Sequence, residues 1–160
     1  MNRRCPQNKL VGLGVLRGWK WIINDLGSAN IVRSSGDRVY GLVYEVSPSD
    51  EAALDKWEGI PWAYTKHTLE FELRWENNKG GSVVQGLVYV DEERTEEAEP
   101  REEYIHRMNM AIKDGATRGF PRWYIDKHMR RFIPDKGGKE AVGSEMEALR
   151  HAVADAKSKM

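Results

Sequence analysis

Residues Leu54–Tyr64 read LDKWEGIPWAY, and they join a helical pattern to a strand pattern. Ser47 is a favourable N-cap for the preceding helix, and Pro48 suits its first turn. Gly59 can adopt the left-handed conformation that closes a helix, and Pro61 prevents the helix from continuing. We therefore expect a short helix that begins after Ser47 and stops at a corner before Gly59.

One carboxylate, Glu58, falls at this corner with Trp57 and Trp62 nearby in the sequence. The free carbonyls of a helix C-terminus disfavour a negative charge beside them. We therefore expect Glu58 to keep its proton more readily than a free carboxyl, as suits a group that accepts and then returns a proton. The same pattern also fits a glutamate at the end of a solvated helix.

The rest of the chain predicts strands first and helices later. Alternation of apolar and polar residues is clearest at residues 67–75. Further strands are expected at residues 10–16, 19–24, 30–32, 38–46 and 83–90, with turns at Gly18, 34–37 and 77–81. Helices are expected from Pro100 to about Gly115 and from Pro121 to Pro134. Without regular strand–helix alternation, this order predicts an α+β fold with a mixed or antiparallel barrel-like sheet flanked by helices.

Two segments are expected, a domain at residues 1–135 and a C-terminal extension at residues 136–160. The extension opens with a glycine-containing hinge. Ser144 and Glu147 then form a capping box for an amphipathic helix. Its apolar stripe suits docking on the body or on a second copy, so a homodimer is one expected arrangement.

Composition favours a globular domain rather than a disordered chain. The 160 residues are 40% hydrophobic and 31% charged, with 25 basic and 25 acidic residues, so overall charge indicates neither nucleic acid nor a membrane surface. No apolar run is long enough to span a bilayer, and no secretory signal is evident. Cys5 is the only cysteine, which fits a cytoplasmic location. The four histidines show no metal-ligand spacing.

Two other features have alternative interpretations. Residues 118–132 interleave arginines with aromatic residues, which suits either nucleic-acid binding or an amphipathic helix; zero net charge favours the helix. Tyr89 falls on a predicted central strand. It fits either a core tyrosine with a satisfied hydroxyl or a hydrogen-bond donor in a pocket between sheet and corner.

The order and spacing of these motifs resemble the γ-glutamylcyclotransferases, including their AIG2-like members. The segments that carry the resemblance are Arg4–Pro6, Val11–Gly12, Asn30–Ile31, Gly36–Gly41, Leu54–Gly59, Tyr64, Val88–Tyr89, Glu103–Tyr104, Gly119–Pro121 and Tyr124–Ile125. They cover residues 3 to about 134, and the LD-x-x-EG core is the most specific.

This resemblance implies a small α/β domain around a closed barrel, and release of a γ-glutamyl group as 5-oxoproline. The catalytic carboxylate falls on Glu58, and the substrate-contacting strand tyrosine falls on Tyr89. Tyr64 and Gly12 are further expected substrate-binding positions. No metal or organic cofactor is expected, and the expected partner is a small γ-glutamyl molecule.

Family members carry a Tyr-Gly-Ser-Asn-type loop after a first strand, ahead of the Arg-Cys-Pro segment. Its amides cradle the substrate carboxylate and carbonyl. The sequence begins at Met1, after that position, so we expect either a sequence that is truncated at its start or a member that lacks the first strand and loop. Loss of one such donor lowers a rate by about 10²–10³. A catalytically impaired relative, acting as a ligand-binding or protein-interaction module, is therefore the alternative to a working enzyme.

Overall fold

The computed structural model describes residues 5–75 and 81–135. In chain order its elements are β1 (Lys9–Ile23), β2 (Ala29–Glu45), α1 (Pro48–Trp57), β3 (Thr65–Trp75), β4 (Gly81–Val90), α2 (Glu102–Thr117), α3 (Arg122–Tyr124) and the π-helix η1 (Ile125–Met129). The expected C-terminal helix, and most of the expected hairpin turn at 77–81, lie outside the described residues.

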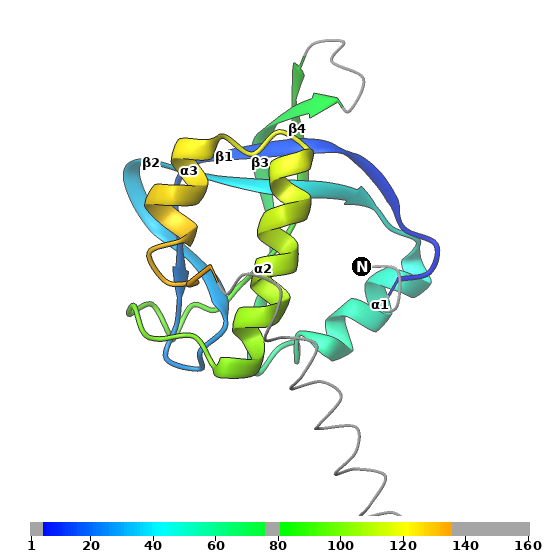
Figure 1. Cartoon of the computed structure of the whole chain (residues 1–160). Coiled ribbons are helices and arrows are strands. Elements are labelled where there is room, and N and C mark those ends of the chain that lie inside the picture. The colour runs from blue at the N-terminus through cyan, green and yellow to red at the C-terminus, as the bar shows by residue number, and fades with distance from the viewer. Residues whose placement is uncertain (1–4, 76–80, 136–160) are drawn as a thin grey trace, which may run out of the picture.

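The strands form one antiparallel sheet in the order β2-β1-β3-β4. Figure 1 shows the sheet curling, with α2 and α3 on one side of the molecule and α1 beyond the ends of β1 and β2. The expected α+β class with an antiparallel, barrel-like sheet is therefore confirmed. The sheet is open rather than closed, because β2 and β4 each have one strand neighbour within the described ranges.

Two long strands replace the four short ones expected before residue 46. The β1–β2 ladder is irregular after Arg17, where Gly18 and residues 34–37 drop out of the pairing. Gly18 and Gly36 both have positive φ, at 77° and 85°. The turn residues therefore form a bulge that bends each strand without reversing the chain, and one strand can serve two parts of a curled sheet.

The core lies between the sheet and the helices α2, α3 and η1. It is formed by buried side chains of β1 and β2, by Val90 of β4, by Ile133 after η1, and by the helical residues Met108, Ile112, Tyr124, Ile125 and Met129. Met108 and Ile112 lie on the buried face of α2, whereas Ala111 is exposed. Tyr124 packs against Tyr40 with ring centroids 4.8 Å apart, which fixes α3 against β2.

A buried polar network joins the end of β4 to β2, where the sheet is not continuous. The Asn30 side chain donates to the Asp91 carbonyl at 2.8 Å and accepts from the Asp91 amide at 3.0 Å. The Asp91 carboxylate, 1% exposed, accepts from Asn24 Nδ2 at 2.9 Å and from Arg94 Nε at 2.6 Å. A side-chain amide thus supplies the hydrogen bonds that a neighbouring strand would make.

Candidate active site

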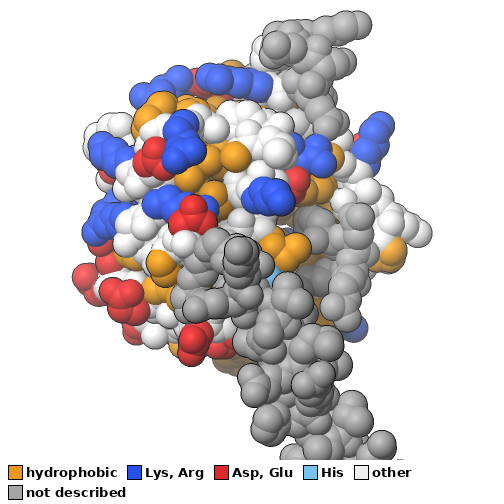
Figure 2. Space-filling view, in the orientation of Figure 1, with side chains coloured by type: hydrophobic (Ala, Val, Ile, Leu, Met, Phe, Trp, Pro, Cys, Tyr) orange, Lys and Arg blue, Asp and Glu red, His pale blue; other side chains and the backbone are white. Residues whose placement is uncertain are grey.

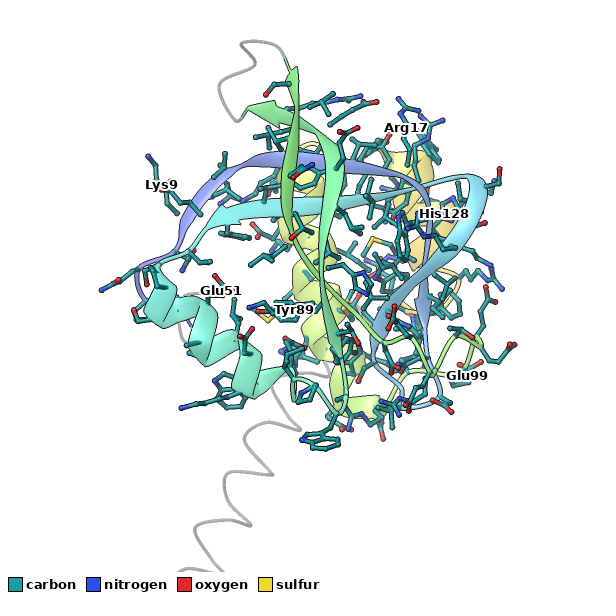
Figure 3. The ribbon with its side chains drawn as sticks, turned by 180° about the vertical axis from the view of Figure 1, so that it is seen from behind. Lys9, Arg17, Glu51, Tyr89, Glu99 and His128 are labelled. Atoms are coloured by element: carbon teal, nitrogen blue, oxygen red, sulfur yellow. The ribbon has the colours of Figure 1, made fainter. Side chains whose placement is uncertain are left out.

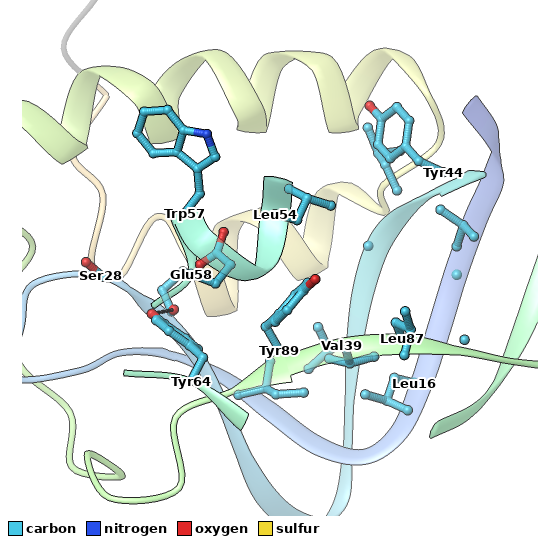
Figure 4. Close-up of a pocket in the computed structure, with 18 of the residues that line it drawn as sticks. Leu16, Ser28, Val39, Tyr44, Leu54, Trp57, Glu58, Tyr64, Leu87 and Tyr89 are labelled. Atoms are coloured by element: carbon cyan, nitrogen blue, oxygen red, sulfur yellow. Dashed lines mark hydrogen bonds between the residues drawn. The ribbon is translucent and has the colours of Figure 1, made fainter. Parts of the chain in front are cut away.

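A cavity of about 1030 Å³ lies between the curled sheet, α1 and α2. Its apolar wall includes Leu16, Val39, Leu54, Phe71 and Val88. Its polar lining includes Glu51, Glu58, Tyr64, Tyr89, Arg101, Tyr104 and Arg107. Figure 4 shows Glu58, Tyr64 and Tyr89 around the same space, below α2. The structure therefore brings three of the four sequence-predicted site residues together in one cavity.

Glu58 is held by the helix-to-strand corner that the sequence predicts. Ser47 Oγ accepts the Asp50 amide at 3.1 Å, which caps the start of α1. At the other end the Glu58 amide donates to the Leu54 carbonyl at 2.8 Å, and Gly59 has φ +67°. Any side chain at Gly59 would be strained in this conformation, so the turn that aims Glu58 depends on glycine.

The apolar surroundings expected around Glu58 differ from those observed. Trp57 is 64% exposed and Trp62 is 88% exposed, so neither packs into the core. Trp57 lines the cavity instead. Glu58 itself is half-buried.

Tyr64 is bound to the free edge of β2. Its hydroxyl donates to the Ala29 carbonyl at 3.0 Å, and the Ala29 amide donates to the Tyr104 hydroxyl at 3.3 Å. Burial and the nearby charge of Glu58 raise the pKa of Tyr64 to about 12, so its hydroxyl keeps its proton. The two tyrosines therefore satisfy an edge residue of β2 that has no strand partner on that side.

Tyr89 points from β4 toward α1, where Glu51 also lies (Figure 3). Its hydroxyl donates to Asp55 Oδ1 at 2.7 Å. Lys66 Nζ donates to Asp55 Oδ2 at 3.0 Å and also to Glu51. The Tyr89 hydrogen bond, followed by the Lys66 bond, lowers the pKa of Asp55, so this carboxylate stays ionised. Burial and the Asp55 hydrogen bond raise the pKa of Tyr89.

Sequence reasoning missed Asp55 and Lys66. The available signal was the position of Asp55 three residues before Glu58, which places both on adjacent turns at one side of α1. Lys66 carried no signal, because its partners belong to a helix that ends nine residues earlier.

Gly12 does not line the cavity; it is buried in the sheet between Val43 and the backbone of Trp75. Gly14, two residues along β1, does line it. A Cβ at Gly14 would stand 2.8 Å from Val43 Cγ2 and 3.2 Å from the ring of Phe71. Glycine at this position therefore lets the Phe71 ring, which lines the cavity, lie close to the backbone of β1.

The helical part of the arginine-rich segment is short, consisting of α3 and η1, and it ends before Pro134, where the sequence predicts the end of the helix. Arginines of the segment are paired with carboxylates. Arg118 pairs with Asp114 at 3.0 Å and Arg122 with Asp126 at 2.9 Å, and Arg131 pairs with Glu97. Figure 2 shows basic and acidic side chains interspersed on the face that α2 and α3 present. This charge pairing favours the helix interpretation, and the expected lack of nucleic-acid binding stays a prediction.

None of the described helices is long and apolar enough to cross a membrane. No three or more His, Cys, Asp or Glu side chains in residues 5–75 and 81–135 gather as a metal site would require. The cytoplasmic location, the homodimer and the lack of a cofactor stay predictions.

Comparison with known proteins then places the chain. The family model described as "Gamma-glutamyl cyclotransferase, AIG2-like" matches residues 2–108, which is most of the chain. The protein belongs to the AIG2-like γ-glutamyl cyclotransferase family, as the motifs around Glu58 predict. No functionally curated protein matches its sequence.

Solved structures show the same fold. One titled "Gamma-glutamyl cyclotransferase" superposes with a TM-score of 0.65 at 23% identity, over 79% of this chain and 76% of that one. A second is the human uncharacterized protein loc79017, with a TM-score of 0.61, 23% identity and the same coverage. At this identity the two structures establish the fold alone.

Proposed function

We propose that this protein is a γ-glutamyl cyclotransferase in which Glu58 moves the proton. The observation that carries the proposal is the position of Glu58, which lines a cavity with Tyr64 and Tyr89 in a chain of this family. Burial, and to a smaller extent the charge of Glu58, raises the pKa of both tyrosines.

The reaction needs few protein groups, because the substrate carries its own nucleophile. The α-amine nitrogen attacks the γ-carbonyl carbon, a five-membered ring forms, and the bond from that carbon to the departing amine breaks. The products are 5-oxoproline and the free amine. Because the nucleophile and the carbonyl belong to one molecule, their correct orientation can lower the activation free energy by on the order of 7–11 kcal/mol.

Glu58 has the remaining task of carrying a proton between two nitrogens. Its carboxylate takes a proton from the attacking amine, and the resulting carboxylic acid gives that proton to the leaving nitrogen. Because the proton returns within one turnover, a single carboxyl group suffices. Arg101 and Arg107 line the same cavity and provide positive charge for the substrate's α-carboxylate.

The direct test is to measure by chromatography the 5-oxoproline that the protein forms from γ-glutamylalanine. Glu58→Gln keeps the size of the side chain but cannot carry a proton, so we expect kcat to fall by about 10²-fold or more. Glu70→Gln is the matched control, since Glu70 is exposed on β3 and does not line the cavity; its kcat should match the wild type.

Two results would contradict the proposal. One is equal rates for the wild type and Glu58→Gln. The other is no product from the wild type with any γ-glutamyl amino acid, peptide or amine. If that inactive wild type still bound the γ-glutamyl compounds, the binding-module alternative would be favoured.

A further inference from the structure

The hydroxyl of Tyr89 has a fixed orientation. A tyrosine hydroxyl carries one proton and two lone pairs. In this structure the proton points at Asp55 Oδ1, 2.7 Å away on α1. While that bond is made, Tyr89 has no proton to donate into the cavity that it lines.

Asp55 is well placed to keep that proton. Both of its oxygens are occupied, one by Tyr89 of β4 and the other by Lys66 of β3 at 3.0 Å. The two strands are neighbours in the sheet, with Lys66 opposite Tyr89 in the register. The carboxylate therefore ties α1 to a fixed point on the β3–β4 ladder, and its lowered pKa keeps it an acceptor at neutral pH.

We propose that Asp55 is a positioning residue that orients Tyr89 as a hydrogen-bond acceptor for the ammonium group of the γ-glutamyl substrate. This inference rests on the proposed function, and it names the substrate group that the tyrosine recognises. It also reverses the donor role that the sequence suggested for Tyr89. With its proton on Asp55, the Tyr89 hydroxyl oxygen can accept from a donor, and Tyr89 lines the cavity together with the carboxylates Glu58 and Glu51, which favour a cation.

The cavity should distinguish ligands by the presence of a protonated α-amine. A ligand with a protonated α-amine should bind better than a matched one in which hydrogen replaces that amine. γ-Glutamylalanine and N-glutarylalanine form such a pair, because they differ only in that group. A hydrogen bond between a neutral acceptor and a charged donor predicts a preference of about tenfold or more.

The experiment measures the affinity of both ligands by calorimetry in the Glu58→Gln protein, which holds the first ligand without converting it. Asp55→Ser is added because serine is too short to accept from Tyr89, and Tyr89→Phe because it removes the hydroxyl. We expect each change to abolish most of the preference, and the two together to do no more than Tyr89→Phe alone. Asp55→Asn keeps an acceptor oxygen, so its preference for γ-glutamylalanine should lie between that of the Glu58→Gln protein and that of the protein that also carries Asp55→Ser.

The control is Asp126→Ser, which removes an aspartate from a surface ion pair with Arg122. It should leave the preference unchanged. Circular dichroism verifies that every variant is folded, and Asp55→Asn replaces Asp55→Ser if the latter is not. A merely structural role for Asp55 would lower the thermal midpoint without changing the preference between the ligands.

Three outcomes would overturn the inference: no preference in the Glu58→Gln protein, an unchanged preference after Asp55 is replaced, or effects of the Asp55 and Tyr89 changes that multiply. None of these depends on turnover. Failure of the proposed function would instead appear as an absence of 5-oxoproline from the wild type.

Discussion

Two aspartates in this molecule make similar hydrogen bonds in different surroundings. Asp91, directly after β4, is 1% exposed, and the donors to its carboxylate, Asn24, Glu93 and Arg94, do not line the cavity. Asp55, on α1, also accepts at both oxygens, but its side chain is 31% exposed and one donor is a tyrosine that lines the cavity. The carboxylate of Asp91 therefore accepts from residues outside the cavity lining, whereas the carboxylate of Asp55 accepts from a residue of that lining.

The difference separates residues that hold the sheet together from residues that shape the site. Asp91 and Asn30 complete the hydrogen bonding where β2 and β4 do not pair. Asp55 fixes a movable proton on a side chain that faces the cavity. Replacement of the first should therefore affect stability, and replacement of the second should affect ligand binding.

The largest effect is expected for Asp91→Ala. This change leaves the Arg94 guanidinium, the Asn24 amide and two backbone amides without their buried acceptor. Removing one partner of a buried charged pair lowers the free energy of unfolding by roughly 3–5 kcal/mol. Urea denaturation followed by tryptophan fluorescence measures the change.

Glu93→Ala is the control, because the Glu93 side chain is 82% exposed. A surface change of this kind should alter the free energy of unfolding by less than about 0.5 kcal/mol. A similar small loss for Asp91→Ala would mean that the network does not hold the sheet edge, and the contrast between the two aspartates would disappear.

The same contrast explains which parts of the structure the sequence predicts. The cap at Ser47, the left-handed Gly59 and the corner that places Glu58 are local, since every interacting group lies within a few residues. The bonds between Asp91 and Asn30 join residues 61 positions apart, and those between Tyr89 and Asp55 join residues 34 apart. The spacing of Asp55 and Glu58 indicates that they share one side of α1, but no local pattern identifies the distant partners of Asp55 and Asp91.

The strand bends were missed for a related reason. Turn residues at positions 34–37 indicate that the chain changes direction, but they do not say whether it reverses. Only the partner strand decides, because β1 continues past Gly18 and keeps β2 paired on both sides of the bulge. The local chemistry was therefore interpreted correctly, and its consequence depended on residues elsewhere in the fold.

A smaller effect should distinguish Tyr64 from Tyr89. Tyr64 donates to the backbone of β2, so we expect Tyr64→Phe to lower the free energy of unfolding by about 1–2 kcal/mol, because the Ala29 carbonyl loses its donor. Affinity for γ-glutamylalanine in the Glu58→Gln protein should change by less than about threefold. Paired measurements by urea denaturation and calorimetry would show the split.

The opposite split would place Tyr64 with Tyr89 among the residues that recognise the ligand. Tyr89→Phe is the matched comparison, since it also removes one hydroxyl from one ring. Its expected pattern is a loss of ligand preference with a smaller loss of stability, because the group left behind is a half-exposed carboxylate that keeps its bond to Lys66.

The smallest effect concerns acid pH. Because the pKa of folded Asp55 lies below its ordinary value, its ionised form stabilises the fold. That contribution is fully present above the ordinary aspartate pKa of about 3.9, and it is lost as the pH falls through the lower folded pKa. The urea midpoint of Asp55→Asn should therefore lie below that of the wild type from pH 7 to 5, and the two should converge at more acid pH. The same comparison, with and without Asp55→Asn, can be made in proteins that also carry Tyr89→Phe or Lys66→Met. Tyr89→Phe should reduce the pH-dependent difference in midpoint more than Lys66→Met, because the Tyr89 hydrogen bond is the larger cause of the lowered Asp55 pKa. If the difference between the two urea midpoints stayed constant down to pH 2.5, the charge of Asp55 would not stabilise the fold.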